Sequence, residues 1–116
     1  MRVSLFTLSL VALATPFAAS AQSRDAPTLI AAGDYRTAEQ VLDADRKIFP
    51  QEPELLLNLA AVYQYTNRGT QARALYQDIL AQPNVLMDLS TERTAWSHEV
   101  AQNGLRRLAG VQMSSR

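Results

Sequence analysis

Residues 67–84 read NRGTQARALYQDILAQPN and repeat, 34 positions later, the pattern of residues 33–50, which read GDYRTAEQVLDADRKIFP. Matched positions carry residues of the same physical role: Gly33 with Asn67, Ala38 with Ala72, Leu42 with Tyr76, and Pro50 with Asn84. Glycine and asparagine tolerate the left-handed backbone that ends a helix, and alanine lets two helices approach closely. The constant interval therefore predicts helical hairpins stacked one after another.

The rest of the chain fits an all-α fold. Apolar residues recur at intervals of three and four, and no segment shows the period of two that is typical of strands. Asp34 supplies a cap for one helix, and Pro50 ends that helix, because the residue before a proline avoids the helical region. We predict helices at about 26–32, 35–48, 54–65, 70–81 and 92–108.

The composition excludes several classes of site. The chain of 116 residues has room for one domain, which we predict over residues 22–110. It holds no cysteine, one histidine and four glycines, which disfavours disulfides, zinc sites, thiol nucleophiles and glycine-rich phosphate loops. Its 11 basic residues balance 11 acidic ones, so no surface built for phosphates is indicated. We expect no cofactor, no metal site and no nucleic-acid partner.

Residues 1–21, MRVSLFTLSLVALATPFAASA, are typical of a secretory signal peptide. One positive charge precedes an apolar run shorter than the roughly 20 residues that cross a bilayer, and small residues end the segment. We expect cleavage after Ala21, which would leave the protein in the periplasm or secreted, without a stable membrane anchor. An uncleaved anchor is the alternative.

The repeated positions resemble those of the tetratricopeptide repeat family. The first copy is carried by Gly33, Asp34, Tyr35, Ala38, Leu42 and Pro50. The fuller second copy is carried by Pro53, Leu59, Ala60, Tyr63, Asn67, Ala72, Tyr76 and Asn84. On this resemblance the repeats fall at about 25–50 and 51–84. The resemblance implies antiparallel helix pairs whose first helices line a concave face, on which another protein or a peptide binds.

Two repeats seldom form a stable stack, so the last helix of the second repeat needs a cover. The candidate is a C-terminal cap at about 90–109, which does not match the repeat. Its helix carries apolar residues at Val100, Ala101, Leu105 and Leu108. We expect residues 111–116 to fray.

Ser97, His98 and Glu99 supply the residue types of a catalytic triad. Neighbours on a helix point about 100° apart, so these three side chains do not converge on one substrate atom. We expect His98 and Trp96 to pack against the domain, with partner binding as the alternative role. No catalytic residue and no enzymatic activity are predicted.

The partner-binding face that the resemblance implies lies on the first helix of the second repeat. Its candidate residues are Glu54, Leu57, Asn58, Ala61, Gln64 and Tyr65. Four of them also share one side of the helix by spacing, since they stand at i, i+4, i+7 and i+8. The alternative is that the cap or the short first helix covers this face.

Two functions follow as hypotheses. The first is a non-catalytic adaptor or assembly module that binds a protein or peptide against a preformed groove. The alternative is a structural protein that forms a homo-oligomer and has no separate ligand.

Overall fold

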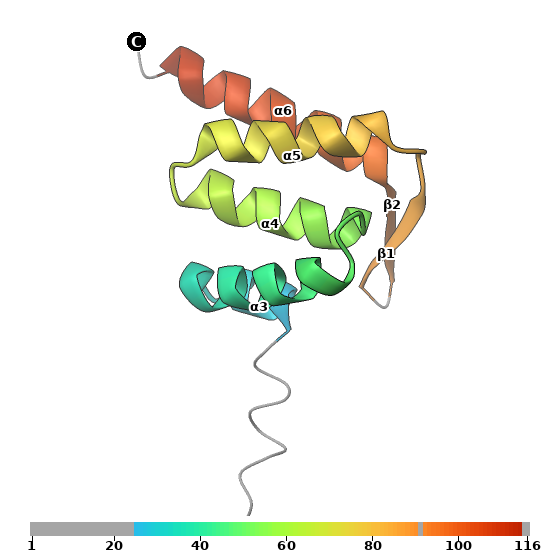
Figure 1. The fold of residues 1–116 in the computed structure, drawn as a ribbon. Coiled ribbons are helices and arrows are strands. Elements are labelled where there is room, and N and C mark those ends of the chain that lie inside the picture. Colours follow the sequence, from blue (N-terminus) through green and yellow to red (C-terminus); the bar gives the residue numbers. More distant parts are fainter. Residues whose placement is uncertain (1–24, 91, 115–116) are drawn as a thin grey trace, which may run out of the picture.

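The computed structural model describes residues 25–90 and 92–114 (Figure 1). The predicted signal peptide lies outside these residues. The described elements are α2 (Ala26–Ala31), α3 (Tyr35–Ile48), α4 (Pro53–Tyr65), α5 (Gly69–Ala81), β1 (Leu86–Ser90), β2 (Arg93–Trp96) and α6 (Ser97–Ser114). Within this part of the chain, no helix combines the length and the apolar character needed to cross a bilayer.

The all-α class is confirmed. Helices α3, α4, α5 and α6 lie in successive layers, and α2 packs beside α3 (Figure 1). Each helix contacts the next one along the chain, as a stack of helical hairpins requires. A two-stranded sheet, β1 with β2, is a small addition at one end of the stack.

The interval of 34 residues has the structural meaning that the sequence predicted. Gly33 and Asn67 both have a left-handed backbone, with φ of 78° and 60°, in the turns before α3 and α5. Ala38 and Ala72 have no exposed surface, so each sits where two helices meet. The two hairpins are therefore built in the same way.

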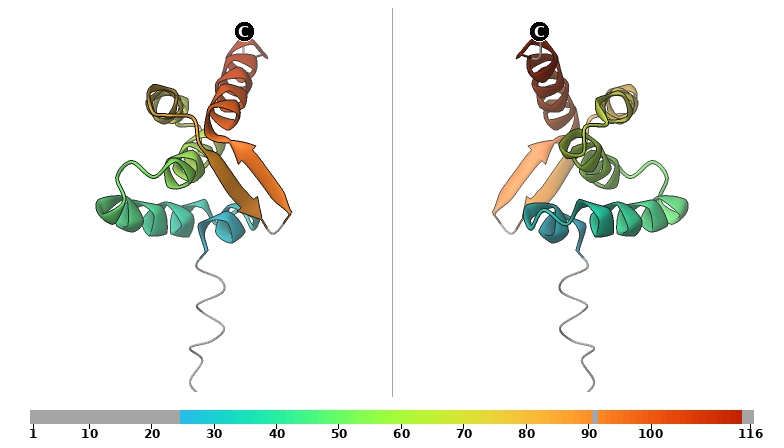
Figure 2. Two further views of the ribbon diagram at one scale, coloured as in Figure 1. Left: turned by 90° about the vertical axis from the view of Figure 1, so that its right-hand side faces the viewer. Right: turned by 90° about the vertical axis from the view of Figure 1, so that its left-hand side faces the viewer.

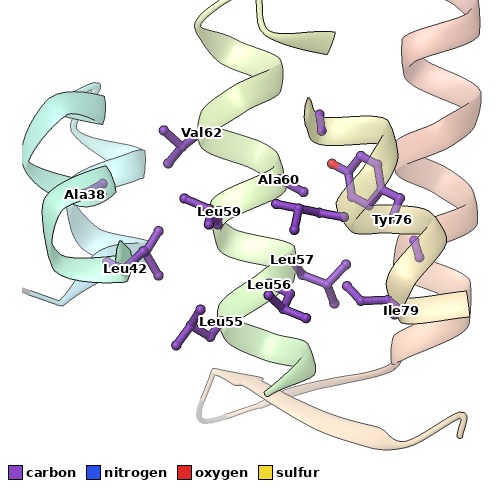
Figure 3. Close-up of a cluster of buried hydrophobic side chains, with 14 of the residues drawn as sticks. Ala38, Leu42, Leu55, Leu56, Leu57, Leu59, Ala60, Val62, Tyr76 and Ile79 are labelled. Carbon is purple, nitrogen blue, oxygen red and sulfur yellow. The ribbon is translucent and has the colours of Figure 1, made fainter. Parts of the chain in front are cut away.

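Helix α4 is the centre of the core and is buried on more than one side (Figure 3). Leu55, Leu59 and Val62 point toward α3, whereas Leu57 and Ala60 lie on the side of α5 and α6. Full burial of one such leucine contributes roughly 1.5–3 kcal/mol. The buried residues of α4 are Leu55, Leu56, Leu57, Leu59, Ala60 and Val62.

A β-hairpin replaces the first turns of the predicted C-terminal helix. The expectation of a helix from residue 92 is wrong, because residues 93–96 form β2 and pair antiparallel with β1. Met87 is buried while Leu86 beside it is exposed, which is the alternation of a strand with one face on the core. The strands have only five and four residues, so their alternation of apolar and polar residues is too short to be recognised in the sequence. The sequence between them also lacks the glycine that commonly marks a hairpin turn.

The N-terminus of α6 is capped by Asn84, which lies 14 residues before His98 in the sequence. The side-chain oxygen of Asn84 accepts a hydrogen bond from the backbone N–H of His98 at 3.0 Å, as a helix cap does. The hydroxyl of Ser97 donates to the same oxygen at 3.4 Å and accepts from the N–H of Val85 at 3.0 Å. The fully buried Ser97 therefore ties the base of the hairpin to α6.

Helix α6 also runs further than predicted. It continues through Gly110 to Ser114, so residues 111–114 belong to the helix, whereas residues 115 and 116 lie outside the described part of the chain. One glycine inside a helix costs only about 1 kcal/mol relative to alanine, and no proline follows to stop the helix. Along its length α6 packs on α5 and also contacts α4.

Candidate functional site

The side of α4 that faces away from α3 lines a hollow of about 240 Å³. We call it the apolar hollow. Helix α2 contributes Pro27, and the hairpin and α6 contribute the opposite wall. The lining residues are Pro27, Glu54, Leu57, Asn58, Ala61, Tyr76, Met87, Leu89, Val100 and Arg107. Four of the six predicted partner-binding residues, Glu54, Leu57, Asn58 and Ala61, therefore lie together here.

A second hollow of about 230 Å³ adjoins the first at the N-terminal end of α4. The two adjoin each other at Pro27, Glu54 and Asn58, which line both, and we call the pair together the α4 groove. The second hollow is lined by α2, α3 and α4 and carries four carboxylates; we call it the acidic hollow. These carboxylates belong to Asp25, Asp45, Glu52 and Glu54.

The walls of the groove come from segments on both sides of the second repeat. The hairpin leaves the end of α5, runs along the side of the stack toward α2, and returns to α6 (Figure 2). This path places Met87 and Leu89 of β1 against the apolar hollow. Helix α2, strand β1 and helix α6, which belong to the elements that the alternative expected to cover this face, border it, and the apolar hollow lies between them.

Glu54 lies where the two hollows meet. Burial raises the pKa of its carboxyl group, and repulsion from Glu52, Asp25 and Asp88 raises it further. Arg107 also lines the apolar hollow. The groove therefore has an acidic end, an apolar middle and a single cation among its lining residues.

The remaining two predicted residues lie elsewhere. The side-chain oxygen of Gln64 accepts a hydrogen bond from the hydroxyl of Tyr76 at 2.9 Å. Gln64 lines a different hollow, of about 270 Å³, beside Leu108. The ring of Tyr65 stacks on that of Tyr35, with centroids 5.4 Å apart and planes 18° apart. The six candidates thus divide between the α4 groove and the far end of α4.

Sequence reasoning did not assign any residue to the opposite wall of the groove. Met87, Leu89, Val100 and Arg107 lie outside the repeat, on the hairpin and on α6. The sequence does mark Val100 as an apolar residue of the cap and residues 85–87 as an apolar run, but neither signal shows where the hairpin folds back.

The residues that resemble a triad serve the hairpin base instead. The Nε2–H of His98 donates to the carbonyl of Gln82 at 2.7 Å, and Ser97 bonds as described above. Trp96 is the last residue of β2, not part of a helix face, and pairs with Leu86 in the strand register. Over residues 25–90 and 92–114, no three His, Asp or Glu side chains are placed to hold a metal ion.

Comparison with known families gives one match. Residues 29–84 match the family model described as tetratricopeptide repeat. No curated protein and no solved structure matches the chain significantly. The matched residues extend from α2 to the end of α5 and its following loop, which is the part of the fold that shows the interval of 34 residues. Residues 29–84, just under half of the chain, are therefore similar to tetratricopeptide repeats.

Proposed function

We propose that the protein is a non-catalytic adaptor or assembly module that binds a segment of another protein in the α4 groove. The observation that carries the proposal is the clustering of Glu54, Leu57, Asn58 and Ala61 in a depression with preformed walls. Repeats of this kind generally mediate interactions between proteins, and a preformed groove lowers the entropic cost of binding a segment.

The proposal includes the compartment. The signal-like sequence of residues 1–21 supports export and cleavage after Ala21, so the partner would be met in the periplasm or outside the cell. Cell fractionation combined with N-terminal sequencing tests this part. A mature chain that begins at Gln22 in the exported fraction is expected, and a cytosolic protein that begins at Met1 would contradict it.

Photo-crosslinking in the living cell tests the groove. A photoreactive amino acid replaces Asn58 at the join of the two hollows, and in a control variant it replaces Asp78, which is exposed on α5 and lines neither hollow. We expect a defined partner to crosslink at position 58 and not at position 78. Ala61→Trp, which fills the apolar hollow, should suppress the crosslink, and equal crosslinking at both positions would refute groove binding.

The hairpin favours a second candidate, a homo-oligomer. Leu86 and Trp96 are neighbours in the strand register, and their exposed fractions are 56% and 47%. Two large apolar side chains on one exposed face are typical of a contact surface. Sedimentation over a concentration series tests this candidate: a dimer that dissociates in the Trp96→Ser variant supports it, and a monomer at all concentrations rejects it.

A further inference from the structure

The two ends of the α4 groove differ sharply in chemistry. The apolar hollow presents Leu57, Met87 and Val100, which suit a medium-sized aliphatic side chain. The acidic hollow presents Asp25, Asp45, Glu52 and Glu54, and its lining includes no basic residue. Because the hollows share Glu54 and Asn58, the acidic and the apolar surface meet at these two residues.

Glu54 is not paired with a cation in the described part of the chain, although Arg107 also lines the apolar hollow. Within residues 25–90 and 92–114 it makes no ion pair and no hydrogen bond through its side chain, whereas Glu39 pairs with Arg68. The carboxylate is half-buried and surrounded by other acids, and both effects raise its pKa. A cation of the partner would offset the cost of keeping Glu54 ionised. Its charge would compensate both the repulsion from the neighbouring acids and the hydration that the carboxylate loses on burial.

We infer that the α4 groove recognises an extended segment of a partner protein in which a lysine or arginine lies about two positions from an aliphatic residue. The aliphatic side chain fills the apolar hollow, and the cation meets Glu54 in the acidic hollow. Side chains two apart on an extended chain point to the same side and lie about 7 Å from each other. This inference rests on the proposed function and adds the chemistry of the partner.

Asn58 and Arg107 influence how the bound segment is oriented in the α4 groove. The amide of Asn58 at the join both donates and accepts hydrogen bonds, as the backbone of an extended segment requires. Arg107 borders the apolar hollow and repels a second cation there. The bound segment therefore places its basic side chain at the acidic end only.

Selection from a displayed library of random heptapeptides tests the inference on the purified protein. We expect the selected peptides to carry lysine or arginine two positions from leucine, isoleucine, valine or methionine. Synthetic peptides from the selection should lose about tenfold in affinity for Glu54→Lys. They should retain wild-type affinity for the control Asp78→Lys, which makes the same change of charge outside the groove.

The outcomes separate this inference from the proposed function. If Ala61→Trp blocks binding of the selected peptides but these peptides are not enriched in lysine or arginine, the inference is overturned and groove binding remains supported. Peptides insensitive to Ala61→Trp, or no selected peptide at all, overturn both. Glu54→Gln provides the same test if the lysine variant does not fold, since loss of the basic preference is again expected. Self-association that Ala61→Trp abolishes would identify a second copy as the occupant and would also overturn the inference.

Discussion

The ring of Tyr76 on α5 lies directly against Gly104 on α6, and three of its carbons occupy the space that a Cβ at position 104 would need. The same tyrosine lines the apolar hollow and donates a hydrogen bond to Gln64 of α4. Burial raises the pKa of its hydroxyl group, so this donor keeps its proton at neutral pH. Gly104 thus lets one aromatic side chain join α4, α5 and α6 beside the groove.

We expect Gly104→Ala to destabilise the protein. The added methyl group forces either the Tyr76 ring or α6 to move, and such overpacking costs about 1–3 kcal/mol. Gly110→Ala is the matched control, because no atom lies within 4 Å of a Cβ at that position of the same helix. Urea denaturation followed by circular dichroism measures both variants. A Gly104→Ala protein as stable as Gly110→Ala would show that the ring does not need this space.

Asn84→Ala should weaken the start of α6. The variant removes the acceptor for the His98 N–H and for the Ser97 hydroxyl, and loss of a helix cap costs about 1 kcal/mol. Asn84→Asp keeps an acceptor there and adds a negative charge that the N-terminus of a helix favours. Thermal unfolding and hydrogen exchange of the first α6 amides report the effect. Equal destabilisation by alanine and aspartate would contradict the capping role.

The repeats could be predicted because their signals are local. Gly33 and Asn67 mark the turns, and Ala38 and Ala72 mark the close contacts, within a few residues of the helices that they shape. The start of α6 could not be predicted in this way. Its cap, Asn84, lies 14 residues before His98 and acts only after the hairpin has folded back.

The candidate site was predictable in part for a related reason. Spacing on one helix brings Glu54, Leu57, Asn58 and Ala61 to one side, and they do meet in the groove. The same spacing extends to Tyr65, which lies about 16 Å further along α4 than Glu54 and does not line the hollow. How far a helix face stays accessible depends on the elements packed against it, and here those are the hairpin and α6.

Glu39→Gln should lower stability at neutral pH and leave it unchanged in acid. Two hydrogen bonds of 2.6 and 3.0 Å join Glu39 to Arg68, whose guanidinium also lies 4.7 Å from the centre of the Tyr63 ring. The bond to Arg68 lowers the pKa of Glu39. A lowered folded pKa stabilises the fold above the unfolded value, near 4.5, and this contribution disappears as the pH falls through the folded value.

Urea denaturation from pH 7 to about pH 3 measures this difference. The curves of the wild type and Glu39→Gln should converge in acid. In an Arg68→Gln background the same substitution should have little dependence on pH, because the partner that lowers the pKa is gone. Parallel curves over the whole range in the wild-type background would show that the ion pair does not couple to folding.

Glu54→Gln should have the opposite effect and raise stability at neutral pH. Burial and the neighbouring acids raise the pKa of Glu54 in the folded protein, so folding favours its protonated form. Ionised Glu54 therefore costs stability above the folded pKa, and the cost disappears as the pH falls through that value. Thermal unfolding should show a higher midpoint for Glu54→Gln at pH 7 and a smaller gain near pH 4, whereas Asp78→Asn on α5 should show no gain. A midpoint at or below that of the wild type at pH 7 would mean that the fold already compensates the negative charge of Glu54. A cation of a bound partner would then gain no stability by offsetting that charge.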